Sequence, residues 1–159
     1  MGGELGQWTE WNEAAAINWD MVNYAEHRGI QLLVRDLNGL YQNSAALHRH
    51  DFEQCGFEWI DCHDHQQSLL SFVRRGDSET LVCLFNFTPV ARSGYRLGLP
   101  HSGTWQEILN SDADVYGGSN LGNQGCITTE DQPHMSQPCS AVLTLPPLTA
   151  IVLQYRSGS

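Results

Sequence analysis

The chain has 159 residues, 41% of them hydrophobic and 16% charged, and this length corresponds to one domain or to one domain with part of another. It contains no lysine, and eight arginines against eighteen acidic residues give a net charge of −10. Such an acidic surface repels both a phosphate backbone and an anionic membrane, so we expect no nucleic-acid partner and no membrane partner.

The cysteines and the N-terminal residues indicate a cytosolic protein. Five cysteines occur without any CxxC pair, and the first residues contain neither a basic region nor the apolar region of a secretory signal. No segment approaches the run of about 18 apolar residues that a membrane-spanning helix needs. We therefore expect reduced thiols and a cytoplasmic location.

Residues 1–54 have helical character. Residues 1–11 are rich in glycine and tryptophan and are expected to form a loop. Apolar residues at three- and four-residue intervals from Ile30 to Leu47 then predict a helix with one apolar stripe. Gly29 and Gly39 weaken this helix by about 1 kcal/mol each relative to alanine. A single amphipathic helix is not stable alone, so its apolar stripe must lie against another element.

Residues 57–155 have β character. Short apolar segments separated by turn residues, with no helix between them, predict an antiparallel β-sandwich. The expected strands are residues 57–60, 69–75, 80–87, 95–99, 104–109, 140–145 and 148–155. The strand that includes 81–87 has apolar residues on both faces and is expected to be central. Residues 110–138 are polar and glycine-rich and predict a long irregular loop, a kind that is often functional or mobile.

Pairs of acidic residues offer one candidate site. Asp61 and Asp64 could act as paired carboxylates in acid–base chemistry. Asp112 and Asp114 could do the same, and they also resemble the start of a calcium-binding loop. That loop type requires a glycine at its sixth position, where this chain has Val115. We therefore interpret these acidic residues as turn caps.

Residues of metal-binding types gather between positions 55 and 65. They are Cys55, Cys62, His63 and His65. The two cysteines are separated by six residues, whereas zinc sites use cysteine pairs separated by two to four residues. We therefore expect a solvated loop with isolated thiols, and no metal and no cofactor. His48 and His50, which flank Arg49 at the end of the predicted helix, are expected to offset the helix dipole.

The glycine-rich segment 117–125 could be mistaken for a phosphate-binding loop. No predicted helix follows it, and the chain has no lysine to reach a phosphate group. We expect a turn-rich loop in which several residues take a positive φ.

The N-terminal segment combines aromatic rings with carboxylates and amides. Trp8, Trp11 and Trp19 lie close in sequence to Glu4 and Glu10. One interpretation is a sugar-binding site, because flat rings cover the apolar faces of sugars while polar groups bind the hydroxyls. The other interpretation is that the tryptophans fill a core or an interface with sequence outside this chain.

A series of short segments carries a resemblance to a known family. They are MGGELGQWTEWN (1–12), INWD (17–20), LVRDLN (33–38), GFEWI (56–60), NFTPV (86–90), YR (95–96), EILN (107–110), GSN (118–120) and LTLPPL (143–148). In this order and with this coverage, the chain resembles the C-terminal part of bacterial glycogen branching enzymes, which belong to the alpha-amylase superfamily.

The resemblance implies a (β/α)8 catalytic barrel followed by an antiparallel β domain. Residues 1–54 would then be the tail of the barrel, with its last loop and outer helix, and residues 55–159 the C-terminal all-β domain. These enzymes transfer α-1,4-glucan segments to make α-1,6 branches, using a carboxylate nucleophile and a second carboxylic acid. Both groups lie earlier in the family's sequences, so the resemblance implies no catalytic residue here and no activity for this part alone.

Two roles remain for the β domain under this resemblance. The first is a structural and interaction module that covers the side of the barrel and stabilises it. The second is an accessory glucan-binding module that uses exposed aromatic residues such as Trp105, Tyr116 or Tyr95.

The resemblance implies that the loop containing Glu4 lies beside the active-site face of the barrel and that the helix packs outside the barrel. Glu4, Trp8 and Trp11 are accordingly the candidate substrate-binding residues for α-glucan or glycogen. Without the barrel sheet, the helix must pack on the β domain, pair with a second copy of the chain, or be partly disordered. We expect an exposed apolar patch between Ile30 and Leu47 that favours self-association.

Overall fold

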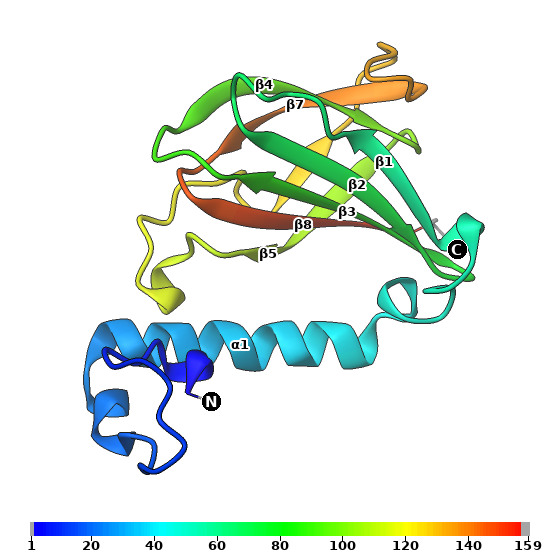
Figure 1. The fold of residues 1–159 in the computed structure, drawn as a ribbon. Helices are drawn as coiled ribbons and strands as arrows, with labels where there is room; N and C mark the ends of the chain where they lie inside the picture. Colours follow the sequence, from blue (N-terminus) through cyan, green and yellow to red (C-terminus); the bar gives the residue numbers. More distant parts are fainter. Residues whose placement is uncertain (1, 157–159) are drawn as a thin grey trace.

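The computed structural model describes residues 2–156 as two antiparallel sheets and one long helix (Figure 1). The six-stranded sheet has the order β1-β2-β3-β8-β5-β6, and the second sheet pairs β4 with β7. The strands are β1 (Phe57–Asp61), β2 (Leu69–Arg75), β3 (Glu79–Asn86), β4 (Arg92–Leu99), β5 (Thr104–Asn110), β6 (Cys126–Thr128), β7 (Cys139–Leu145) and β8 (Thr149–Arg156). Helix α1 spans Ala25–Asn43, and the expected mainly-β fold with a preceding helix is confirmed.

The predicted strands are found close to their predicted positions, and one strand was missed. Strand β2 matches the prediction at both ends, whereas β4 begins at Arg92 rather than at Tyr95. The missed strand, β6, lies within the predicted irregular loop and pairs with only three residues of β5. Three residues are too few to show an alternating pattern, so sequence periodicity could not detect it.

Strand β3 lies inside the six-stranded sheet, between β2 and β8, as its two apolar faces predict. Val82 and Leu84 point into the core between the sheets and are fully buried. Leu81 and Cys83 point to the opposite face, where a second apolar cluster covers them. A strand that is covered on both faces needs apolar residues at successive positions, which explains the sequence of β3.

Helix α1 packs on the outer face of the six-stranded sheet and runs beneath it in Figure 1. Leu33 and Leu40 of α1, together with Leu47 just after it, contact this face. The sheet contributes Leu81 and Cys83 of β3, Val152 of β8 and Leu109 of β5. Of the three arrangements considered for the helix, packing on the β domain is the one observed. Within residues 2–156, no helix is long and apolar enough to cross a membrane.

Gly29 allows α1 to touch the loop that follows β5. A Cβ atom on Gly29 would lie 2.2 Å from the carbonyl oxygen of Tyr116, a distance that no real side chain tolerates. The Tyr116 hydroxyl donates to Asp36, about two turns further along the same helix face, at 2.8 Å. The glycine that weakens the isolated helix is therefore required for its packing.

The side chain of Trp105 does not lie on the surface, contrary to the prediction from the sequence. Its side chain is fully buried in the main core, and its Nε1–H donates to the carbonyl oxygen of His101 at 3.0 Å. The Tyr155 ring packs against it, with the ring centroids 5.3 Å apart. The prediction of a glucan contact at Trp105 was wrong because this residue of β5 points toward the inside of the sandwich.

Candidate functional site

A row of aromatic side chains crosses the outer face of the six-stranded sheet beside α1. We call it the aromatic face, and it consists of Phe57, Trp59, Phe72, Phe85 and Phe87. Trp59 and Phe72 are cross-strand partners with ring centroids 5.8 Å apart. Phe85 and Phe87 stack with an interplanar angle of 7°. Phe72 and Phe85 pack against the buried cluster on this face, whereas Trp59 is 49% exposed and Phe87 is 62% exposed, so the row extends from the core to an exposed apolar surface.

The aromatic face continues into an apolar groove between α1 and the sheet. This groove, which we call the α1 groove, has a volume of about 320 Å³. Its lining residues are Leu33, Leu37, Phe85, Asn86, Phe87, Leu109, Ser111, Leu148, Thr149 and Ala150. Leu148, at the rim, is 69% exposed. The groove and the aromatic face share Phe85 and Phe87 and therefore form one continuous apolar surface.

Helix α1 has a second apolar stripe that the β domain does not cover. The stripe in contact with the β domain consists of Gly29, Leu33, Asp36 and Leu40. The second stripe, about 100° around the helix, consists of Ile30, Val34, Leu37 and Tyr41. Three of these side chains are exposed and Val34 is half-buried. An exposed apolar stripe next to an exposed aromatic surface is typical of a face that binds another protein element.

The N-terminal segment lies against the start of α1, and the three candidate substrate-binding residues all belong to it (Figure 1). Trp8 packs edge-on against the His27 ring, with centroids 4.8 Å apart, and is 68% exposed. Trp11 is 71% exposed and lines a shallow pocket of about 210 Å³. Glu4 is exposed in the first short turn, Gly3–Leu5. Of the three, only Trp11 lines this pocket among the described residues, together with Gln7, Thr9, Glu10, Asn12, Ala15, Ala16 and Ile17.

The other two tyrosines considered for glucan contact are both half-buried. Tyr116 uses its hydroxyl for the hydrogen bond to Asp36, and burial with this bond raises its pKa to about 12. Tyr95 packs against the main core, and its burial raises its pKa to about 12. Tyr95 also lines an open groove of about 530 Å³ on the β4 side of the domain. The polar lining of this groove includes Asp64, Gln67, Arg92, Arg96 and His134.

Three of the four acidic residues first considered as paired carboxylates act as turn caps, as predicted. Asp61 accepts a hydrogen bond from the backbone N–H of His63, at 2.8 Å. Asp64 accepts from the backbone and side-chain N–H groups of Gln67. Asp112 holds its loop by accepting from the backbone N–H and the hydroxyl of Ser119 and from the backbone N–H of Leu121. The segment 117–125 contains the expected positive φ angles at Gly117, Asn120, Gln124 and Gly125.

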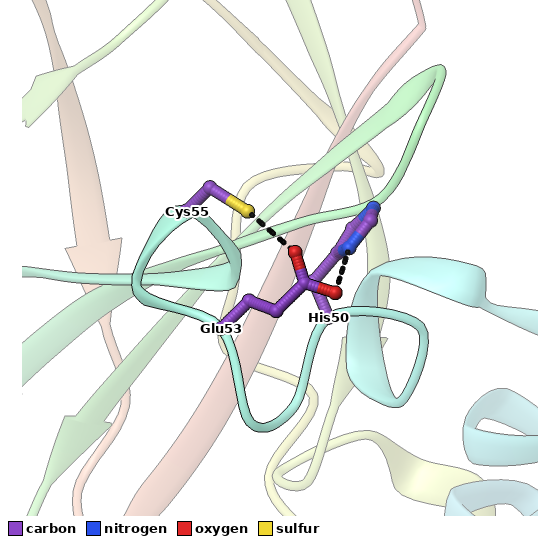
Figure 2. A group of neighbouring side chains, drawn as sticks. All are labelled: His50, Glu53 and Cys55. Atoms are coloured by element: carbon purple, nitrogen blue, oxygen red, sulfur yellow. Dashed lines mark hydrogen bonds and ion pairs between the residues drawn. The ribbon is translucent and has the colours of Figure 1, made fainter.

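The cysteine- and histidine-rich segment divides into two groups. Cys62 lies with its sulfur 3.6 Å from Nε2 of His63, and the rings of His63 and His65 are 6.4 Å apart. Cys55 instead joins His50 and Glu53 in the connection between α1 and β1 (Figure 2). The sequence interpretation missed this second group because it considered His50 only as a helix-end charge, although the spacing H-x2-E-x-C was available in the sequence.

The group of His50, Glu53 and Cys55 is built from two short contacts. Nδ1 of His50 lies 3.2 Å from Oε1 of Glu53, and the Cys55 thiol donates to Oε2 of Glu53 at 3.5 Å (Figure 2). On its other side, Nε2–H of His50 donates to Asp77 in the β2–β3 turn at 2.9 Å. The carboxylates of Asp77 and Glu53 raise the pKa of His50 above its usual value.

The fold and the sequence define the class of this chain. Residues 59–156 match the family described as alpha amylase, C-terminal all-beta domain, and the chain belongs to this family. An alpha-amylase from H. orenii has a similar fold, with a TM-score of 0.50 over 80% of this chain and 20% of that one, at 20% sequence identity.

The relatives within the superfamily are branching enzymes. The chain is 57% identical over 157 residues to the 1,4-alpha-glucan branching enzyme GlgB of Hydrogenovibrio crunogenus, covering 99% of this chain and 22% of the relative. It is 52% identical to the same enzyme of Marinobacter nauticus, covering 97% and 25%, and 53% identical to that of Thiobacillus denitrificans, covering 97% and 21%. The resemblance to bacterial glycogen branching enzymes is confirmed, and the chain spans about a quarter or less of these relatives.

Proposed function

We propose that the chain works as the C-terminal part of a 1,4-α-glucan branching enzyme. The whole enzyme would transfer α-1,4-glucan segments to form α-1,6 branches, with two carboxylates supplied by the catalytic barrel. This part would contribute no catalytic residue and would be inactive alone. The proposal is supported by 57% identity across 99% of the chain to an enzyme of that name, of which the chain spans 22%.

Within such an enzyme, the β domain would be a structural module that covers the side of the barrel. The observation that carries this role is the second apolar stripe of α1 beside the exposed aromatic face. Helix α1 is apolar over more of its circumference than the β domain covers, as expected of a helix between two partners. Residues 1–54 would then be the tail of the barrel, and residues 55–159 the C-terminal all-β domain.

The proposed substrate contact is at the N-terminal segment. Glu4, Trp8 and Trp11 are all exposed there and would face α-glucan bound to the barrel. Aromatic rings of this exposure can stack on the apolar faces of glucose units, while carboxylates and amides accept or donate hydrogen bonds to hydroxyls. A cytoplasmic location accords with this function and with the five free cysteines.

A chimera tests the proposal. The segment of the Hydrogenovibrio crunogenus enzyme that matches this chain is replaced by this chain, and branching is followed as the loss of iodine staining of a linear glucan. We expect activity within several-fold of the parent, and no activity from this chain alone. A chimera that folds but does not branch glucan, or branching by the isolated chain, would contradict the proposal.

The same chimera tests the covering role. Leu37→Glu and Phe87→Glu place charges on the uncovered surface and are expected to lower the melting temperature of the chimera much more than that of the isolated chain. Gln42→Glu, at an exposed polar position of α1, is the matched control. Equal effects in the chimera and the isolated chain would show that the barrel does not lie against this surface.

A second candidate function is an accessory glucan-binding module, favoured by the open groove beside Tyr95. The groove combines an aromatic ring with charged and amide side chains, which is the composition of many sugar sites. Native gel electrophoresis in glycogen tests it, with Tyr95→Ala and Arg96→Ala as the variants. If glycogen retards the chain and both variants weaken this retardation, glucan binding at the groove is supported. Equal mobility with and without glycogen would exclude this function. Trp105→Ala is unsuitable as a variant because Trp105 lies in the core.

A further inference from the structure

The connection between α1 and β1 folds three metal-binding side chains onto one point. The backbone N–H of Glu53 donates to the carbonyl oxygen of His50 at 3.1 Å, and that of Gly56 donates to the carbonyl oxygen of Glu53 at 3.1 Å. These two consecutive turns bring the chain back on itself. One ligand atom from each of His50, Glu53 and Cys55 lies within 4.8 Å of the others (Figure 2).

We propose that His50, Glu53 and Cys55 bind one zinc ion, with Nδ1, a carboxylate oxygen and the thiolate as ligands and water in the fourth position. Imidazole, carboxylate and thiolate are the three ligand types of protein zinc sites, and three protein ligands with one open position are a common arrangement. A tetrahedral zinc ion with its usual bond lengths separates its ligand atoms by roughly 3.3–3.8 Å. Nδ1 of His50 lies 3.2 Å from Oε1 of Glu53, Sγ of Cys55 lies 3.5 Å from Oε2, and the three ligand atoms all lie within 4.8 Å of one another. Side-chain rotations would bring Nδ1, Sγ and one oxygen of Glu53 to the separations that zinc requires.

The His50 ring is held in the orientation that a metal ligand needs. Its Nε2–H donates to Oδ1 of Asp77, so Nδ1, which lies 3.2 Å from Oε1 of Glu53, is the ring atom left to bind a metal ion. Nδ1 is buried, and among the described residues it makes the 3.2 Å ion-pair contact with Glu53 but no hydrogen bond of regular geometry. A histidine ligand that donates its second N–H to a carboxylate is the usual support of a zinc site. Nε of Arg49 lies 3.5 Å from Oδ2 of the same carboxylate.

The charges of the ligands match a divalent ion. A neutral imidazole, one carboxylate and one thiolate carry two negative charges, which Zn²⁺ neutralises. On binding, the Cys55 thiol releases its proton to solvent and the sulfur–zinc bond replaces the S–H bond. Any proton on Nδ1 of His50 leaves to solvent in the same way, and the nitrogen–zinc bond replaces the N–H bond. The thiolate and imidazole select zinc over calcium or magnesium, which prefer oxygen ligands only.

Zinc at this position would fasten three elements together. His50, Glu53 and Cys55 belong to the connection that leaves α1, Gly56 leads directly into β1, and Asp77 belongs to the β2–β3 turn. The ion would therefore stabilise the junction between the helical part of the chain and the β domain. This inference concerns the β domain and its connection only, and it does not rest on the proposed branching activity.

Zinc competition with a chromophoric chelator tests the proposal on the full chain, kept reduced with a phosphine. We expect one zinc ion per chain. Cys55→Ser and His50→Gln should weaken binding by more than about tenfold, and Asp77→Asn by about 10- to 100-fold, as for other outer-sphere carboxylates. Cys126→Ser removes an exposed thiol elsewhere and is the matched control. Unchanged affinity in Cys55→Ser, or no binding by the unsubstituted chain, would overturn the proposal.

Cobalt spectroscopy adds a second measurement that does not depend on stability. Co²⁺ bound to a thiolate gives a sulfur-to-metal charge-transfer band in the near ultraviolet, and this band should disappear in Cys55→Ser. Cys62→Ser should leave it unchanged. Loss of the band in Cys62→Ser instead would place the metal at Cys62, His63 and His65 and would refute the site at Cys55. Circular dichroism of each variant without metal confirms that it is folded.

Discussion

Nδ1 of His27, in the first turn of α1, donates a 2.7 Å hydrogen bond to the carbonyl oxygen of Leu5. Both residues are buried, and they are 22 positions apart in the sequence. The same ring supports Trp8 on its face. A single histidine therefore holds the N-terminal segment, with its exposed tryptophans, against the helix.

Replacing His27 should release the N-terminal segment while the β domain stays folded. His27→Ala leaves the buried carbonyl of Leu5 without its donor, which costs about 1–3 kcal/mol. We expect faster hydrogen exchange and faster proteolysis within residues 2–24, with unchanged exchange in β2, β3 and β8. Arg28→Ala, at the exposed neighbouring position, should leave the segment protected. Equal protection in His27→Ala and Arg28→Ala would show that other contacts hold the segment.

The two glycines of α1 should respond to alanine in opposite directions. Gly39→Ala meets no atom within 4 Å and should stabilise the chain by roughly 0.5–1 kcal/mol through helix propensity. Gly29→Ala gains the same propensity, but its Cβ would lie 2.2 Å from the Tyr116 carbonyl oxygen. We expect a net loss of about 1–3 kcal/mol, as for other overpacked contacts. Urea denaturation at neutral pH measures both, and stabilisation by Gly29→Ala would mean that the loop moves freely away from the helix.

The behaviour of these glycines illustrates what the sequence could and could not reveal. Helix propensity and periodicity are local properties, so they predicted the helix and seven strands but gave no reason for Gly29. That reason is a contact with Tyr116, which is 87 residues away in the sequence. The split of the helix into a covered and an uncovered apolar stripe likewise depends on where the sheet lies, and periodicity showed only one stripe.

The candidate sites were predicted less well than the strands, for a related reason. In the sequence, Cys55, Cys62, His63 and His65 were considered together, and their spacing argued against a metal site. The group at His50 depends instead on two tight turns and on Asp77 from another hairpin. Trp105 was expected at the surface as one of the exposed aromatic residues of a glucan-binding module. Only the pairing of β5 with β8 and β6 settles which face of β5 points inward.

Trp105 should behave as a core residue in stability measurements. Trp105→Ala removes a fully buried side chain and its hydrogen bond to His101, and it should cost about 3–5 kcal/mol. Trp59→Ala, in a half-exposed residue of the aromatic face, should cost far less. Far-ultraviolet circular dichroism in urea measures both without relying on tryptophan fluorescence. Similar costs for the two variants would mean that Trp105 is less buried than the structure shows.

The bond between Tyr116 and Asp36 predicts a stability difference that depends on pH. Arg35 and Tyr116 hold the pKa of Asp36 below 3.8. A lowered carboxyl pKa contributes stability that is complete above 3.8 and is lost as the pH falls through the folded-state value. Tyr116→Phe should therefore lower the free energy of unfolding by about 1 kcal/mol at pH 7. This loss should become smaller as the pH falls below 3.8 and Asp36 is protonated.

The same hydrogen bond should also lose its contribution to stability at alkaline pH. The pKa of Tyr116 is raised from 10.0 to about 12, so its contribution is complete below pH 10 and is lost between pH 10 and about 12. The difference in free energy of unfolding between the unsubstituted chain and Tyr116→Phe, measured in urea, should thus have its plateau between the acid and alkaline limits. A difference that stays constant down to the lowest pH would mean that Tyr116 does not interact with the Asp36 carboxylate. In a chain that carries Asp36→Asn, the loss of stability caused by Tyr116→Phe should no longer change at low pH.

The uncovered stripe of α1 should make the isolated chain self-associate. Ile30, Leu37 and Tyr41 are exposed, and Leu37 also lines the α1 groove. In the chain alone, the exposed parts of these side chains can be buried only against another molecule. Sedimentation velocity should show an average mass that rises with protein concentration, in spite of the repulsion caused by a net charge of −10. Higher salt should strengthen the association because it screens that repulsion.

Substitutions on the stripe separate this surface from the rest of the molecule. Leu37→Glu with Tyr41→Glu should give a monomer at every concentration, because burying either carboxylate in an apolar contact is costly. Gln42→Glu adds charge to the same helix at a polar position and should leave the association unchanged beyond a small electrostatic effect. A chain that sediments as a monomer at high concentration and high salt would show that the stripe is too small to hold two copies together. In that case, only the larger surface of the barrel would bury the stripe.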